Sequence, residues 1–347
     1  MSCSVKLSRM FLLGFDGCTL EHNERLADAL ARHSPAGVIL FDRNVDTTIQ
    51  NFSSPQQLQE LTGQLQEAAS EPLLIAVDQE GGRVCRLKER DGFPATVSAA
   101  ELGRELPELS TGPAAAMAAA LAQYGINLNL APVADLNLNP ANPIIAQYGR
   151  SFDCRADAVA AHCRAFIKAH HQQGIACCLK HFPGHGSAAG DSHLGFVDIT
   201  DDWQEEELAP YTRLIRDGLA DAVMTAHVVH NRLDPAGLPA TLSPAVLTTL
   251  LRRKMGFDGV IMTDDLQMKA ISDRYGFWQA VQLAVTAGAD LLIVGNNLVR
   301  NPDALDQGVA AIQELLDQGL VSEERLEQSL QRIQRLLQVN RLFVDGR

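Results

Sequence analysis

A loop rich in small residues ends in two polar residues that could transfer a proton. The segment KHFPGHGSAAGDSH runs from Lys180 to His193, with Asp191 and His193 two positions apart. A carboxylate at that spacing can hold the imidazole, select its tautomer and raise its pKa toward the range of a general acid or base. The small residues before this pair would allow the loop to move over a pocket. A polar turn is the alternative interpretation.

Two adjacent aspartates, Asp264 and Asp265, follow an apolar run in the segment MTDDLQM. Side chains alternate along a strand, so both carboxylates cannot point into the same pocket. One could serve as a nucleophile or an electrostatic stabiliser, while the other caps the following helix or braces its neighbour. A purely structural role for both is the alternative.

The segment VDQEGGRVCR adds a third carboxylate, Asp78, at the end of another apolar run. A short carboxylate in that position is suited to accept hydrogen bonds from adjacent hydroxyl groups. Gly81 and Gly82 permit a tight return of the backbone, which would bring Arg83 and Arg86 near the same space. A structural Asp–Arg pair under the loop is the alternative.

The hydrophobic pattern of the chain predicts a parallel sheet that would hold these polar segments in place. Short apolar runs, several of them nearly continuous as in strands covered on both faces, alternate with longer amphipathic segments. Strands are predicted at residues 11–15, 37–42, 73–78, 127–135, 175–181, 222–229, 259–264 and 291–295. Helices are predicted at residues 155–173, 243–255, 277–287, 303–317 and 322–342, the last two packing outside the sheet.

Eight strands that alternate with helices fit a closed TIM-type (β/α)8 barrel better than an open sheet. The length of 347 residues suits one such barrel. We therefore expect residues 1–347 to form a single catalytic domain with C-terminal helices. Polar residues follow seven of the predicted strands, at the carboxyl ends where barrel active sites lie.

Composition narrows the function classes. The chain has 29 Lys and Arg against 42 Asp and Glu, a formal charge of −13 that disfavours nucleic acid as a partner. No apolar stretch approaches the ~20 residues that cross a bilayer, so no membrane partner is expected. The seven cysteines are odd in number and contain no CxxC pair, which favours a cytoplasmic location over a disulfide framework.

A metal site is the competing interpretation of the histidine-rich loop. His181, His185, Asp191 and His193 include two types of metal ligand. However, the HxxxH spacing crosses Pro183 and Gly184, so these histidines cannot share one face of a helix, and no second ligand cluster is obvious. We predict neither a metal nor another cofactor.

Together these residues favour transfer of a glycosyl group to water. That chemistry needs a carboxylate beneath the anomeric carbon, a proton donor beside the leaving oxygen, and groups that bind sugar hydroxyls. The motifs VDQEGGRV, APVADL, GRSF, KHFPGHG with a downstream DSH, and DGVIMTDDLQM then resemble those of glycoside hydrolase family three. Within it, the chain is similar to the short bacterial β-N-acetylhexosaminidases of peptidoglycan recycling.

The resemblance implies a role for each residue. Asp264 would be the nucleophile of a retaining mechanism, and His193, held by Asp191, the acid/base. The positions that would bind a terminal N-acetylglucosamine are Asp78, Arg86, Arg150, Lys180 and His181. The chain departs from the family pattern at Gly149 and Thr225, which bears on fine substrate preference. The implied partner is a saccharide from muropeptides, bound by a monomer.

Three other classes of function remain open from the sequence. A β-glucosidase or an N-acetylglucosaminide phosphorylase of the same broader family would share the barrel, although family β-glucosidases usually take their acid/base from a second domain. A lyase could form a Schiff base on Lys180. A barrel that binds carbohydrate without catalysis is the third, and the intact Asp191, His193 and Asp264 argue against it.

Overall fold

Eight parallel strands form the centre of the protein in a computed structural model that describes residues 7–21, 23–192 and 194–342. They are β1 (Phe11–Gly14), β2 (Gly37–Ile39), β3 (Leu74–Val77), β6 (Leu128–Asn129), β7 (Ala176–Phe182), β9 (Ala222–Thr225), β11 (Val260–Met262) and β12 (Leu292–Val294). Each strand pairs in parallel with the next in this order, and β12 pairs with β1. A parallel bridge between Met262 and Leu291 joins β11 to β12 and closes the barrel. The predicted fold class is confirmed.

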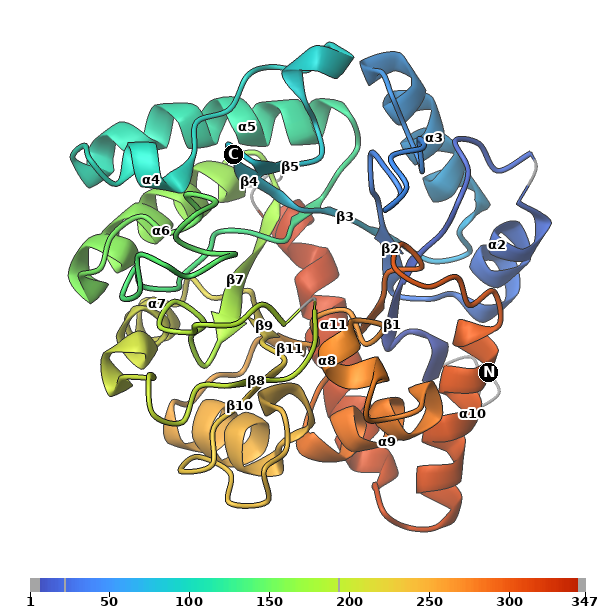
Figure 1. Cartoon of the computed structure of the whole chain (residues 1–347). Coiled ribbons are helices and arrows are strands. Elements are labelled where there is room, and N and C mark those ends of the chain that lie inside the picture. Colours follow the sequence, from blue (N-terminus) through green and yellow to red (C-terminus); the bar gives the residue numbers. More distant parts are fainter. Residues whose placement is uncertain (1–6, 22, 193, 343–347) are drawn as a thin grey trace.

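Helices surround the barrel on its outside (Figure 1). The longer ones are α3 (Pro55–Ala68), α5 (Thr111–Gln123), α6 (Ala156–His171), α7 (Ala209–Arg216), a π-type helix at Ala245–Lys254, α9 (Phe277–Ala287), α10 (Ala304–Asp317) and α11 (Glu323–Leu342). Shorter ones are α2 (Glu24–Asp28), α4 (Ala99–Leu102) and α8 (Lys269–Ser272). All five predicted helices are present to within two residues at each end. No helix in the described ranges is long and apolar enough to span a membrane.

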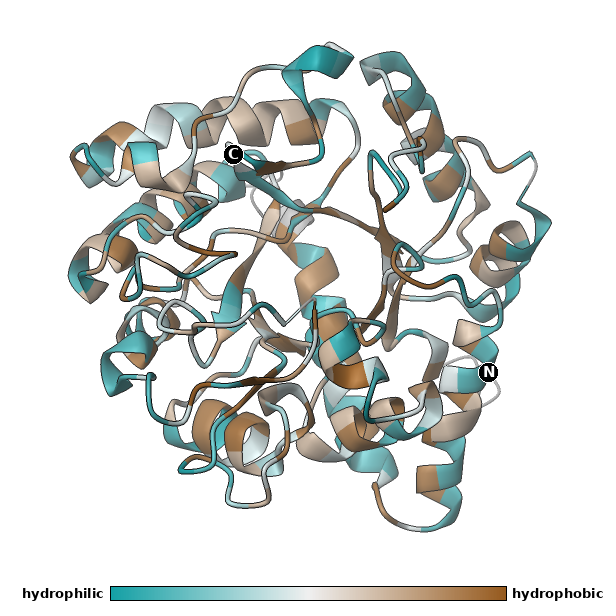
Figure 2. Ribbon diagram, viewed as in Figure 1, coloured by the Kyte–Doolittle hydropathy of each residue, from teal (hydrophilic) through white to brown (hydrophobic). Residues whose placement is uncertain are grey.

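The strands are apolar because both of their faces are covered. Each residue of β3, from Leu74 to Val77, is fully buried. The barrel strands are accordingly brown in Figure 2, and brown and teal patches alternate around the outer helices. Burial of this apolar surface stabilises the barrel and leaves the strand ends to carry polar side chains.

Most of the strands are shorter than predicted, and two of the predicted ranges differ the most. Residues 127–135 contribute only β6, because Pro132 has no N–H to continue the ladder and Val133 makes an isolated bridge to Lys180. Residues 222–229 divide into β9 and β10 (Val228–Val229), and β10 pairs with β8 (Val197–Asp198) instead of with the barrel.

Both ends of the helix near residue 250 have a local cause in the sequence. The Ser243 hydroxyl accepts a hydrogen bond from the Val246 N–H at 3.1 Å, as an N-cap does. Gly256 follows the helix with a φ of 71°, a left-handed conformation that favours glycine.

Candidate active site

Two adjoining pockets of about 420 and 210 Å³ lie at the carboxyl ends of the strands. Seven of the eight residues that the sequence singles out line one or both pockets: Asp78, Arg86, Arg150, Lys180, His181, Asp191 and Asp264. The eighth, His193, lies outside the described residues. Residues from β3, β7, the loop after β7 and the end of β11 therefore meet in one place, although up to 186 positions separate them.

A chain of ion pairs forms the polar wall of the larger pocket. The Lys180 ammonium lies 2.7 Å from Asp78 Oδ1 and 2.7 Å from Glu80 Oε1. Arg150 donates two hydrogen bonds to Glu80, at 2.8 Å from Nε and 2.7 Å from an NH2 nitrogen. Arg86 closes the other end at 3.0 Å from Asp78 Oδ2. Two carboxylates and three cations are thus held in fixed positions by one another.

These ion pairs set the charge state of the wall. Burial raises the pKa of Glu80, but Arg150 and Lys180 outweigh it and lower that pKa to about 2. Burial also raises the pKa of Asp78. The positive charges of Lys180 and Arg86 outweigh this effect and hold that pKa well below its usual range. Burial lowers the pKa of Lys180, but Asp78 and Glu80 outweigh it, so the pKa is raised. Lys180 is therefore an ammonium ion, which argues against a Schiff-base lyase because that chemistry needs a neutral amine.

His181 is oriented by a carboxylate that lies deeper in the barrel. Its Nδ1 lies 2.7 Å from Asp135 Oδ2, and its Nε2 lies 3.1 Å from an NH2 nitrogen of Arg150. Because arginine can only donate, Nε2 accepts and Nδ1 donates to Asp135. Asp135, fully buried, also accepts a hydrogen bond from the His185 N–H at 2.8 Å. Asp135 and Arg150 therefore fix the orientation of the His181 ring at the pocket wall.

The glycine pair returns the chain as predicted. Gly81 and Gly82 have φ values of 100° and 61° between strands β4 (Gln79–Gly81) and β5 (Val84–Cys85). The hairpin brings Arg86 back to Asp78, so the structural Asp–Arg pair does form, and both residues also line the pockets. The Arg83 guanidinium lies 3.6 Å from the centre of the Tyr148 ring, a cation–π contact at the mouth of the larger pocket.

The adjacent aspartates make different contacts. Asp265 Oδ1 accepts hydrogen bonds from the N–H groups of Gln267 at 3.0 Å and Gly295 at 3.1 Å, so it braces the end of β12. Asp264 lines both pockets, and its Oδ1 accepts the Asp265 N–H at 2.8 Å. Both aspartates line the smaller pocket, and Asp264 lines the larger pocket as well.

The first half of the loop after β7 is packed into the protein. Residues 183–188 are buried, and the Asn142 side chain donates to the carbonyls of His185 at 2.8 Å and Ala188 at 3.0 Å. A Cβ at Gly186 would lie 1.7 Å from the Leu136 carbonyl oxygen, so only glycine fits there. Any movement of the loop over the pocket, as the small residues predict, must begin after residue 188.

A buried acid, Glu207, supports the same half of the loop. It accepts hydrogen bonds from the Ser187 hydroxyl at 2.6 Å and the Gly186 N–H at 3.1 Å. Burial raises its pKa to about 7. No motif in the sequence singles out this residue, which is the third of three consecutive glutamates.

Glu207→Gln should change how stability depends on pH. The pKa of Glu207 is higher in the folded protein than in the unfolded chain, where it is near 4.5. Protonation of Glu207 therefore stabilises the fold fully below pH 4.5, and this stabilisation is lost as the pH rises through 7. Glutamine does not titrate. From pH 5 to pH 8 the unfolding free energy of the variant should therefore rise by about 2 kcal/mol relative to that of the wild type. Urea unfolding at both pH values measures this, with the exposed neighbour Glu206→Gln as control. If the variant and the wild type differ in unfolding free energy by the same amount at pH 5 and pH 8, the raised pKa of Glu207 is contradicted.

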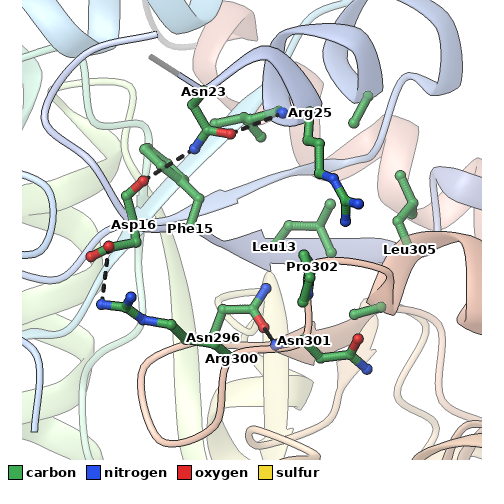
Figure 3. Close-up of a pocket in the computed structure, with 13 residues that line it drawn as sticks. Leu13, Phe15, Asp16, Asn23, Arg25, Asn296, Arg300, Asn301, Pro302 and Leu305 are labelled. Carbon is green, nitrogen blue, oxygen red and sulfur yellow. Dashed lines mark hydrogen bonds and ion pairs between the residues drawn. The ribbon is translucent and has the colours of Figure 1, made fainter.

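A third pocket, of about 280 Å³, lies on the outer side of β1 near α2 and α10 (Figure 3). Its floor is apolar, with Leu13, Phe15 and Leu305. Its arginines are already paired, Arg25 with Asp303 at 2.7 Å and Arg300 with Asp16 at 3.0 Å. It brings together none of the residues that the sequence predicts for catalysis, so it is not the active site.

Sequence reasoning missed Glu80, the carboxylate that joins Lys180 to Arg150. A signal was present, because Asp78 and Glu80 are two positions apart and alternate residues of an extended chain share a face. Within the described ranges, no group of three or more His, Cys, Asp and Glu side chains is placed to hold a metal ion.

A closed parallel barrel with a carboxylate-lined pocket at the carboxyl ends of its strands defines the class of (β/α)8-barrel enzymes. Residues 4–336 match the Glycosyl hydrolase family 3 N terminal domain. The chain belongs to this family and is a glycoside hydrolase.

Relatives with assigned names agree with this. The chain is 38% identical over 292 residues to a beta-hexosaminidase of Tolumonas auensis, covering 82% of each chain. It is 37% identical over 317 residues to one of Xanthomonas axonopodis pv. citri, covering 88% of this chain and 87% of the relative.

Solved structures extend the likeness to the fold. A family 3 beta-N-acetylglucosaminidase from Paenibacillus sp. str. FPU-7 matches all of this chain at 34% identity and a TM-score of 0.89. This chain spans 64% of that longer protein. A Beta-N-acetylhexosaminidase from Beutenbergia cavernae matches 97% of this chain and 98% of its own at 29% identity and a TM-score of 0.84.

Proposed function

We propose that the protein is an exo-acting, retaining β-N-acetylglucosaminidase that removes terminal β-linked N-acetylglucosamine from peptidoglycan fragments. The observation that carries this proposal is that Asp264 and Asp191 line the same pocket as the Asp78–Lys180–Glu80–Arg150 wall. The names of the relatives support N-acetylglucosamine as the sugar that is removed. The resemblance to the peptidoglycan-recycling enzymes supports a muropeptide as the substrate.

In the proposed mechanism Asp264 attacks the anomeric carbon while His193 protonates the leaving oxygen. The covalent glycosyl-enzyme is then hydrolysed by a water from which His193 takes a proton, so the β configuration is retained. Asp191 would hold the imidazole in the required tautomer. A neutral imidazole adds no second negative charge beside the glycosyl ester, an advantage over a second carboxylate.

The sugar would be held by Asp78, Arg86, Arg150, Lys180 and His181. Because these groups are already hydrogen-bonded to one another, they are oriented before the substrate arrives, which lowers the entropic cost of binding. We further propose that the chain acts in the cytoplasm as a monomer, with residues 1–347 forming one catalytic domain and no cofactor.

Product analysis tests the function. The enzyme should hydrolyse an aryl β-N-acetylglucosaminide much faster than an aryl β-glucoside, and NMR should show the β anomer of N-acetylglucosamine first. Preference for the glucoside would favour a β-glucosidase instead. Sugar 1-phosphate in phosphate buffer would favour a phosphorylase. Release of N-acetylglucosamine from a muropeptide ending in anhydro-muramic acid tests the substrate.

The acid/base role of His193 predicts a dependence on the leaving group. His193→Ala should lower the rate about 10²–10⁴-fold for a sugar leaving group, which needs protonation, and much less for a nitrophenolate, which does not. Asp191→Asn should show the same trend more weakly. Rates for a series of aryl leaving groups measure the effect, and equal losses across the series would exclude the role.

A further inference from the structure

A pocket of about 370 Å³ lies at the end of the barrel opposite the active site. It is formed where the helix Ala245–Lys254, the turn before β12 and the start of α11 meet, and α11 crosses behind the barrel in Figure 1. Four arginines line it: Arg252, Arg253, Arg325 and Arg332. None of the described residues that line it is acidic. This concentration of positive charge is unexpected in a chain with a net charge of −13.

The carboxylates behind the pocket do not balance its arginines. Asp290, fully buried, lies 2.6 Å from Arg252 and 3.4 Å from both Arg325 and Arg332. Asp258 pairs with Arg332 at 3.0 Å, but it also pairs with a fifth arginine, Arg335, at 2.9 Å. Four guanidinium groups therefore share two carboxylates, and Arg253 adds a fifth positive charge to the pocket lining.

The excess charge is costly because the arginines are partly buried. The side chains of Arg252, Arg325 and Arg332 are 17%, 25% and 12% exposed. The pKa of Arg252 is lowered to about 10, first by burial and then by the neighbouring Arg332 and Arg325, in spite of Asp290. Partly buried cations without counter-charge destabilise a fold unless an anion joins them.

We propose that this arginine pocket binds an oxyanion of phosphate type that carries two or more negative charges. A guanidinium has five N–H donors in a planar fork that matches phosphate oxygens, and the contacts to Asp290 use only part of them. Arg253 makes no ion pair within the part of the chain that the structure describes. Ser322, the residue before the 20-residue helix α11, also lines the pocket, and its hydroxyl accepts a hydrogen bond from the Arg325 N–H at 3.2 Å. The bound anion would join α11 to the barrel.

Thermal unfolding with inorganic phosphate or pyrophosphate, against sodium chloride at equal ionic strength, tests the site. Saturating pyrophosphate should raise the wild-type Tm by about 3 °C or more beyond the chloride effect. Arg253→Gln should fold normally, because Arg253 is exposed, and should weaken pyrophosphate binding at least about tenfold by calorimetry. Arg104→Gln, an exposed arginine elsewhere, should bind as the wild type does.

Two results would overturn the proposal. An equal rise in Tm with chloride would show that only screening acts. Equal pyrophosphate binding by Arg253→Gln and the wild type would place the anion elsewhere, for example at the active-site cations, and competitive inhibition of hydrolysis would then identify that location. Because the readout is binding, the test is independent of the proposed activity.

Discussion

Asp264→Asn should abolish turnover, with a loss in kcat of about 10⁴-fold or more, as expected when a catalytic nucleophile is removed. An amide cannot form the glycosyl ester, so no covalent intermediate is available. The variant should keep its fold, because the asparagine Oδ1 can still accept the Asp265 N–H that Asp264 accepts at 2.8 Å.

Hydrolysis of an aryl N-acetylglucosaminide measures this loss. Asp201→Asn is the control, because its carboxylate is 98% exposed and should be dispensable. A fluorosugar that traps the intermediate should add one sugar mass to the wild type and none to the Asp264→Asn variant. Near-wild-type turnover by Asp264→Asn would refute the mechanism.

Lys180→Met should have the largest effect on stability, together with a large loss of substrate affinity. The lysine side chain is 2% exposed and lies 2.7 Å from both Asp78 and Glu80. Its removal leaves those carboxylates with one arginine each in a buried place, which costs about 3–5 kcal/mol of unfolding free energy at pH 7. Sugar binding should weaken because the wall loses its central donor.

The pH dependence separates this effect from lost packing. A carboxylate whose pKa is lower in the folded protein than in the unfolded chain stabilises the fold above the unfolded-chain pKa, which is near 4. This stabilisation disappears as the pH falls toward the pKa in the folded protein, which is about 2 for Glu80. The penalty of Lys180→Met should therefore shrink at pH 4. Denaturant unfolding at pH 7 and 4 measures it, with the exposed Lys168→Met as control. A penalty that is the same at both pH values would indicate packing alone. Adding Glu80→Gln should recover part of the loss at pH 7.

The sequence by itself determined the barrel and most of the wall of its site. Strand and helix periodicities are local properties, so the eight strands and the ends of five of the longer helices could be placed from residue types alone. The position of polar residues directly after the strands then indicated which end of the barrel carries the site, since parallel strands bring their carboxyl ends to one face.

Only the tertiary structure decided which charged groups share partners. Glu80 joins Lys180 to Arg150 across a gap of 100 and 70 positions in the chain, and Glu207 supports a loop some 20 positions away. Such contacts depend on how several strands and loops converge. The alternation of Asp78 and Glu80 could place both carboxylates on one face, but it does not indicate which cations they meet. The arginine pocket has the same origin, because Arg252 and Arg325 become neighbours only when α11 crosses the end of the barrel and both meet Asp290.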